Sequence, residues 1–112
     1  IYEKSEKAIY TPGAAFLNVM APCPRGWRYP TEQIMDICKL AVETCYWPLF
    51  EVIEGKWILS YSPKKKLPIE DFLRTQGRFK HLFKPENEHL LVQYQEEVDR
   101  RWEDLLFRCS KN

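Results

Sequence analysis

The stretch AAFLNVM at residues 14–20 runs directly into APCPRGW at residues 21–27. The first of these is an apolar run bounded by Pro12-Gly13 and Pro22, which predicts a short buried strand. A strand that is apolar on both faces is typical of the centre of a parallel sheet. Cys23 follows the carboxyl end of this strand, where open α/β sheets bind their ligands. The flanking prolines stiffen the loop, which favours metal ligation or redox chemistry, although an ordinary turn cysteine is the alternative.

The rest of the chain shows helical periodicity interrupted by one hairpin pattern. Helices are predicted over residues 3–10, 31–45, 68–77 and 88–107. Thr31 is the expected N-cap of the second helix, and Gly77 is expected to end the third. The longest helix offers i,i+4 ion pairs on its outer face, namely Glu96–Arg100, Glu97–Arg101 and Asp104–Arg108. Trp47–Ile53 and Lys56–Ser62 flank Glu54-Gly55, which predicts a β-hairpin.

Composition narrows the class of protein. The 112 residues carry 17 basic and 16 acidic side chains, a net charge of +1, which argues against attraction to nucleic acid or to a membrane surface. Hydrophobic residues make up 45% and aromatic residues 14%, which indicates a folded chain whose aromatic side chains partly face a partner. Two of the four cysteines, Cys38 and Cys45, share the apolar stripe of a predicted helix, so we expect reduced thiols and a cytoplasmic location.

Four motifs occur in a fixed order along the chain. They are APCPRGW at 21–27, LAVETCYWPLFE at 40–51, PIEDFL at 68–73 and QGRFKHL at 76–82. Together they resemble the C-terminal part of the β subunit of pyruvate:ferredoxin oxidoreductase. That subunit is the thiamine-diphosphate-binding subunit of the 2-oxoacid:ferredoxin oxidoreductase family. The resemblance extends from about Lys7 to about Leu106.

The resemblance implies a fold and a site. The fold would be α/β, a C-terminal fragment of a thiamine-diphosphate-binding fold with its last parallel strand and helix, followed by a β-hairpin and C-terminal helices. Residues 1–62 would end the thiamine-binding domain, and residues 63–112 would form a helical extension. Cys23 would be one ligand of a [4Fe–4S] cluster, which takes four thiolates. Trp27 would limit the access of solvent to that cluster. The resemblance gives no catalytic residue in this chain.

The chain also departs from the family. It lacks the Cys-x-x-Cys pair that supplies other cluster ligands, and it lacks the Gly-Asp-Gly segment that holds Mg²⁺ and the diphosphate. We therefore expect a fragment that is inactive alone and does not bind thiamine diphosphate by itself. The whole enzyme would oxidatively decarboxylate a 2-oxo acid such as pyruvate to acyl-CoA. It would use coenzyme A and ferredoxin, and this segment would pack on the remainder of the β subunit and on other subunits.

Other interpretations compete with this one. The chain is alternatively a cofactor-free interaction or assembly domain. A zinc or redox module would use Cys23, Cys38, Cys45 and Cys109, although zinc ligands usually come in closely spaced pairs. His81 is a conceivable general base, but a packing or solvent-facing histidine is favoured. Lys64-Lys65-Lys66 is a basic linker for phosphate or an acidic partner, with a solvated turn as the favoured alternative.

Overall fold

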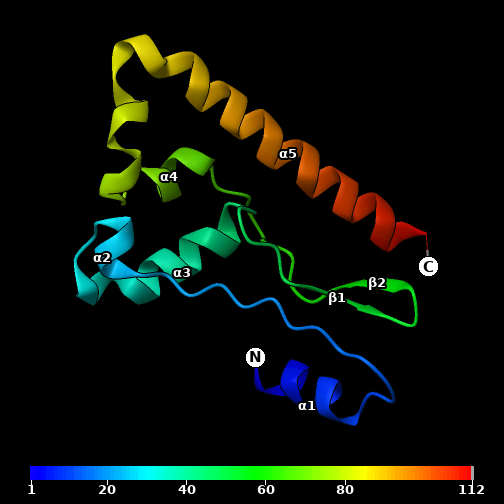
Figure 1. The fold of residues 1–112 in the computed structure, drawn as a ribbon. Helices are drawn as coiled ribbons and strands as arrows, with labels where there is room; N and C mark the ends of the chain where they lie inside the picture. Colours follow the sequence, from blue (N-terminus) through cyan, green and yellow to red (C-terminus); the bar gives the residue numbers. More distant parts are fainter. Residues whose placement is uncertain (112) are drawn as a thin grey trace.

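Helix α5 (Glu88–Ser110) is the longest element and runs diagonally across Figure 1. The computed structural model describes residues 1–111 of the chain. Apolar side chains recur along this helix at spacings of three and four residues, and all of them are buried or half-buried. They are Leu91, Tyr94, Val98, Trp102, Leu105 and Cys109. No helix in the described part of the chain combines the length and the apolar character needed to cross a bilayer.

A group of short helices packs together beside α5 and encloses the core (Figure 1). They are α2 (Pro24–Trp27), η1 (Thr31–Gln33), α3 (Ile34–Glu43), α4 (Ile69–Leu73), η2 (Gly77–Phe83) and η3 (Pro85–Asn87). Phe72 is fully buried, and its ring lies 4.5 Å from the ring of Tyr46, centroid to centroid. Burying one such side chain contributes roughly 1.5–3 kcal/mol. The core contains residues from both sides of the predicted boundary at residue 62, and the division into 1–62 and 63–112 stays a prediction.

The predicted hairpin is confirmed. Strands β1 (Phe50–Ile53) and β2 (Lys56–Leu59) pair antiparallel, with Ile53 opposite Lys56. Glu54 and Gly55 both have positive φ, 50° and 78°, as a two-residue type I′ turn requires. An isolated hairpin is only marginally stable, so this hairpin depends on its contact with α5 for stability. There the guanidinium carbon of Arg108 lies 4.9 Å from the centroid of the Trp57 ring.

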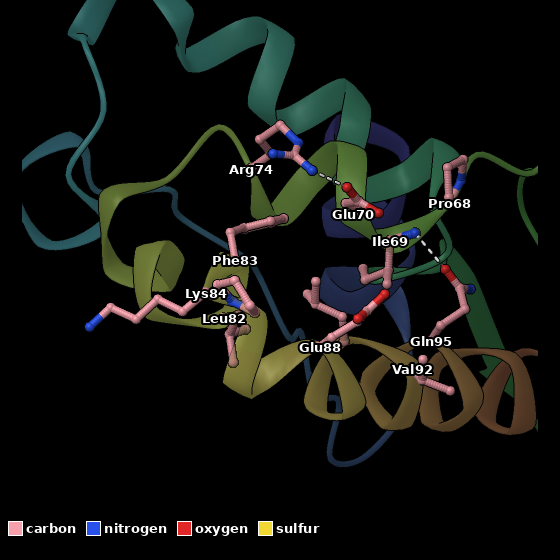
Figure 2. A pocket seen from close by; sticks show the side chains of 12 residues that line it. Pro68, Ile69, Glu70, Arg74, Leu82, Phe83, Lys84, Glu88, Val92 and Gln95 are labelled. Atoms are coloured by element: carbon pink, nitrogen blue, oxygen red, sulfur yellow. Dashed lines mark hydrogen bonds and ion pairs between the residues drawn. The ribbon is translucent and has the colours of Figure 1, made fainter.

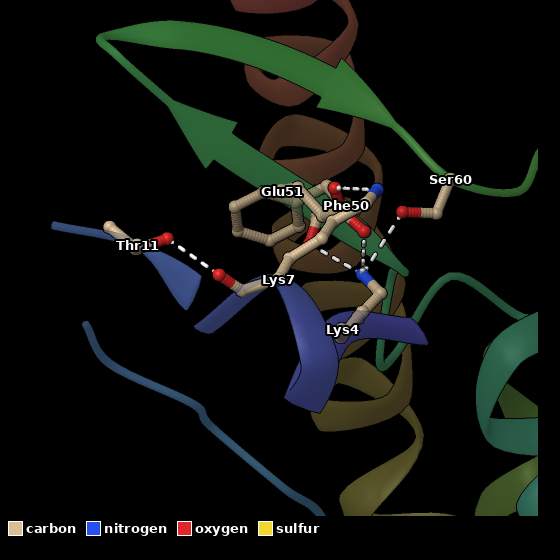
Figure 3. Close-up of polar contacts among 6 residues, drawn as sticks. All are labelled: Lys4, Lys7, Thr11, Phe50, Glu51 and Ser60. Atoms are coloured by element: carbon tan, nitrogen blue, oxygen red, sulfur yellow. Dashed lines mark hydrogen bonds and ion pairs between the residues drawn. The ribbon is translucent and has the colours of Figure 1, made fainter. Parts of the chain in front are cut away.

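Helix α1 (Tyr2–Tyr10) confirms the first predicted helix, but it buries none of its residues. Polar contacts attach it to the hairpin, as Figure 3 shows. The Nζ of Lys4 donates to the carbonyl of Phe50 at 2.8 Å, and the Nζ of Lys7 lies 2.9 Å from Oε2 of Glu51. Because exposed ion pairs contribute little each, α1 depends on several such contacts acting together.

The strand predicted over residues 14–20 is not formed. This segment is extended but unpaired, and most of its apolar side chains face solvent, with Phe16 87% and Val19 56% exposed. Only Met20 packs against the core. A strand needs a neighbouring backbone for its hydrogen bonds, and in residues 1–111 the one sheet is the two-stranded hairpin. The expected parallel sheet is therefore absent from the described part of the chain, which is a mixed α/β structure with a hairpin and C-terminal helices.

Three local predictions were also wrong. Thr31 begins the short 3₁₀ helix η1 instead of capping α3, and its side chain makes no cap. Gly77 does not end a helix, because α4 stops at Leu73 and Gly77 begins η2. On α5, Asp104 pairs with Arg108 as expected. Arg100 pairs with Glu97 at the i,i+3 spacing, so neither Glu96–Arg100 nor Glu97–Arg101 is among the ion pairs of the described residues. Both spacings bring side chains together on a helix surface, so sequence alone does not choose between them.

A polar network fastens the segment before α4 to α5. Lys66 forms an ion pair with Asp99, and the Nε2 of Gln95 donates to the same carboxylate at 2.8 Å. The Oε1 of Gln95 accepts the backbone N–H of Ile69 at 2.7 Å. Partial burial raises the pKa of Asp99, but the hydrogen bonds from Lys66 and Gln95 outweigh it and lower the pKa overall. The carboxylate therefore stabilises the fold above the pKa it has in the unfolded chain.

Asp99→Asn should lower the free energy of unfolding at pH 7 by about 0.2–1 kcal/mol, because the pair is partly exposed and screened. The folded pKa lies below the unfolded value near 4, so the difference from wild type should shrink as the pH falls below about 4. Urea unfolding at pH 7 and pH 3 measures this. Glu103→Gln, at an exposed position of the same helix, is the matched control. An equal cost for Asp99→Asn at both pH values would contradict the ion-pair explanation.

Candidate functional site

Cys23 is the N-cap residue of α2 and has extended backbone, with φ −99° and ψ 110°. Its carbonyl accepts the N–H of Trp27 at 2.8 Å, and its Sγ accepts the N–H of Gly26 at 3.4 Å. Pro24 occupies the first helical position, where a proline pre-sets the backbone. The thiol is exposed. The turn thus presents one thiol at a fixed place on the surface, where it can bind a group supplied from outside the segment.

A close backbone contact fastens this turn to η2. The N–H of Gly77 donates to the carbonyl of Arg28 at 2.8 Å, and Arg28 itself has left-handed backbone with φ 59°. A Cβ atom on residue 77 would lie 2.7 Å from the Cβ of Arg28 and 3.1 Å from its carbonyl oxygen. Only glycine permits so close an approach. The position of the Cys23 turn therefore depends on a residue far along the chain.

The ring of Trp27 lies at the centre of the packing around this turn. It meets the rings of Phe72 and Tyr29 edge to face, with centroids 6.1 and 6.4 Å apart. The guanidinium carbon of Arg78 lies 3.9 Å from its centroid, and the Nε of Arg78 donates to Oε1 of Gln76 at 2.7 Å. Trp27 is half-buried by these contacts. The predicted role of Trp27 in excluding solvent from a cluster stays a prediction.

The other cysteines are not gathered around Cys23 into a metal site. Cys45 is buried just beyond the end of α3, and burial raises the pKa of its thiol, which keeps it protonated and unreactive. Cys38 and Cys109 are half-buried on α3 and α5. Among residues 1–111 no group of three or more His, Cys, Asp or Glu side chains could hold a metal ion, which leaves the zinc interpretation without support. Cys45 is buried as the stripe pattern predicted.

The remaining candidates have ordinary surroundings. His81 is exposed on η2, and the contact that involves it uses its carbonyl, which accepts from Nδ2 of Asn87 at 2.7 Å. Lys64 and Lys65 are exposed, as expected of a solvated turn, whereas Lys66 is held by α5 through Asp99. None of these residues forms a catalytic arrangement.

Figure 2 shows a groove of about 520 Å³ between α4, η2 and the first turns of α5. Two of its charged side chains pair with each other, the guanidinium of Arg74 and the carboxylate of Glu70. Arg74 also lies over the ring of Phe83, with its guanidinium carbon 4.3 Å from the centroid. No residue of the Cys23 turn lines this groove. Arg74 and Glu70 neutralise each other, and we assign the groove no ligand.

Sequence reasoning missed several residues that surround Cys23. Gly77 and Arg78 belong to the QGRFKHL motif, but only His81 was considered there as a functional group. Tyr29 and Gln76 gave no signal beyond their residue types, yet both are buried, at 7% and 2% exposure. The joint occurrence of the motifs was the signal that could have identified these residues, because the structure brings APCPRGW and QGRFKHL into contact.

Comparison with known proteins finds close relatives over most of the chain. Pyruvate synthase subunit PorB of Thermotoga maritima is 45% identical over 106 residues, which is 94% of this chain and 33% of that protein. Ketoisovalerate oxidoreductase subunit VorB of Pyrococcus horikoshii is 46% identical over 99 residues, 87% of this chain and 32% of that protein. PorB of Methanosarcina barkeri is 44% identical over 80 residues, 71% of this chain and 27% of that protein.

These relatives confirm the resemblance predicted from the motifs. The chain is homologous to a segment of oxidoreductase subunits named PorB and VorB. It spans about a third of the length of the curated relatives it matches. No family model matches the chain.

Gly77→Ala should force Arg28 and residue 77 apart and loosen the turn that carries Cys23. Such overpacking costs about 1–3 kcal/mol of unfolding free energy. Gly26→Ala is the control, because its added Cβ would meet the Sγ of Cys23 at an ordinary 3.6 Å. Urea unfolding compares the two variants. Equal stability of the two would show that the close approach at Gly77 does not hold the turn.

Proposed function

We propose that this chain is the C-terminal part of the β subunit of a 2-oxoacid:ferredoxin oxidoreductase, with pyruvate as the leading substrate. The observation that carries the proposal is the 45% identity to a pyruvate synthase subunit across 94% of the chain. A subunit named for ketoisovalerate oxidation matches equally well, so these residues do not choose the 2-oxo acid. The four free thiols suit a reducing, cytoplasmic location.

The role proposed for Cys23 is that of one ligand to a [4Fe–4S] cluster. Its features fit that role: the thiol is exposed, proline fixes its turn, and a backbone N–H already points at the sulfur. Hydrogen bonds to the sulfurs of such clusters tune their potential. The three other ligands would come from outside this segment, since the remaining cysteines do not form a metal site here. When bound, the cluster supplies one-electron transfer.

Thiamine diphosphate and Mg²⁺ do not fit the described residues. Gly13 and Gly55 sit in isolated turns, and Gly77 packs on Arg28, so no glycine-rich loop cradles a phosphate. The whole enzyme would hold both groups elsewhere and would convert a 2-oxo acid, coenzyme A and two oxidised ferredoxins into acyl-CoA, CO₂, two reduced ferredoxins and a proton. This segment positions a sulfur ligand and supplies packing surface, and it would be inactive alone.

The packing surface proposed for this segment consists of apolar side chains that the other described residues leave exposed. The extended segment 14–20 exposes Phe16 and Val19, and the hairpin exposes Val52. We propose that residues 14–20 become the last parallel strand of the thiamine-binding sheet, because apolar side chains on both faces suit a central strand. The same exposure favours the alternative, a cofactor-free assembly domain, which would bury this surface without contributing a sulfur ligand.

Cys23→Ser separates these two functions. In the complete oxidoreductase it should remove or alter the electron paramagnetic resonance (EPR) signal of one [4Fe–4S] cluster, because a serine oxygen is a poor substitute for a thiolate. Cys38→Ala is the matched control and should keep full iron content with a small loss of stability. An unchanged EPR spectrum for Cys23→Ser would refute the ligand role and favour the assembly domain.

A further inference from the structure

Two buried side-chain polar atoms in the described part of the chain have no hydrogen-bond partner. They are the hydroxyl of Tyr29 and the Nη2 of Arg78. Buried polar atoms are nearly always paired, so an unpaired one calls for a specific explanation. Both side chains contact the ring of Trp27, although residues 29 and 78 lie far apart in the sequence. Their coincidence at one place makes two unrelated packing defects a poor explanation.

That place is the turn of Cys23. The N–H of Trp27 donates to the carbonyl of Cys23 at 2.8 Å and closes the turn. The N–H of Tyr29 donates to the carbonyl of Pro24 at 3.1 Å. Burial, and then the neighbouring Cys38 and Cys23 thiols, raise the pKa of Tyr29. Its hydroxyl lies buried without a partner in the packing around Trp27.

The guanidinium of Arg78 is fixed in position by packing and a hydrogen bond, and no carboxylate of the described residues neutralises it. Its guanidinium carbon lies 3.9 Å from the Trp27 ring centroid and 4.4 Å from that of Phe79. Its Nε is bonded to Gln76, which is itself buried and donates to the carbonyl of Phe72 at 3.0 Å. Among the ion pairs of residues 1–111 none involves Arg78. A fixed cation without a carboxylate partner leaves an uncompensated positive charge in the packing behind the turn.

We propose that Arg78 and Tyr29 stabilise negative charge on the sulfur atoms held at Cys23 and thereby raise the reduction potential of the cluster. The proposal rests on the cluster-ligand role proposed for Cys23. Reduction adds one electron to the cluster and breaks no bond, so a fixed positive charge close to the turn, with a buried O–H group beside it, favours the reduced form. The two residues act on the potential without binding iron.

The test is an EPR-monitored redox titration of the complete oxidoreductase. Arg78→Gln and Tyr29→Phe should keep the cluster but shift its midpoint potential to more negative values, with the larger shift for Arg78→Gln. Arg100→Gln changes an exposed arginine paired with Glu97, and Tyr61→Phe removes a hydroxyl bonded to Glu43. These two controls should titrate as wild type.

Wild-type potentials in cluster-loaded Arg78→Gln and Tyr29→Phe would overturn the proposal. If Arg78→Gln does not assemble, Tyr29→Phe decides, because it removes only one oxygen atom whose hydrogen bonding the segment leaves unsatisfied. Failure of this proposal differs from failure of the proposed function. If Cys23 is not a ligand, Cys23→Ser leaves the EPR spectrum unchanged. If only the roles of Arg78 and Tyr29 are wrong, Cys23→Ser alters the spectrum, but Arg78→Gln and Tyr29→Phe keep the wild-type potential.

Discussion

The hydrogen bond from the N–H of Gly77 to the carbonyl of Arg28 is the constraint on which the site depends. It joins the turn that carries Cys23 to η2, and it is possible only because residue 77 has no Cβ. Once the two backbones touch, Trp27 is enclosed between Phe72 and Arg78. The exposed thiol thus lies on a short turn whose position is set by the core and not by the exposed chain before it.

The two ends of the molecule are built on different physical principles. Near the beginning of α5, burial of Phe72, Ile37 and their neighbours holds the short helices together. At the other end, α1 is attached to the hairpin by lysine contacts with Phe50 and Glu51, and it buries nothing. The proposed sulfur ligand sits at the apolar, tightly packed end. Precise placement of a metal ligand requires such rigid support.

Sequence patterns predicted those elements whose signals are local. The Glu54-Gly55 turn requires positive φ at both residues, and the stripe on α5 repeats at helical spacing, so both could be read from the chain. The strand predicted at residues 14–20 does not form within the described residues, because an apolar pattern indicates what a segment would bury and not which backbone it pairs with. Cys23 was identified as a candidate through a motif, whereas the roles proposed for Arg78 and Tyr29 rest on a contact between distant motifs that no single motif reveals.

The proposed function of the site depends on ligation of iron by the Cys23 sulfur. X-ray diffraction from crystals of the complete oxidoreductase, with data collected on either side of the iron absorption edge, tests this ligation. We expect an anomalous iron peak bonded to the Sγ of Cys23, with the side chains of Trp27 and Arg78 beside it. An iron cluster whose four thiolates all come from other cysteines, with the Cys23 thiol unligated, would contradict it.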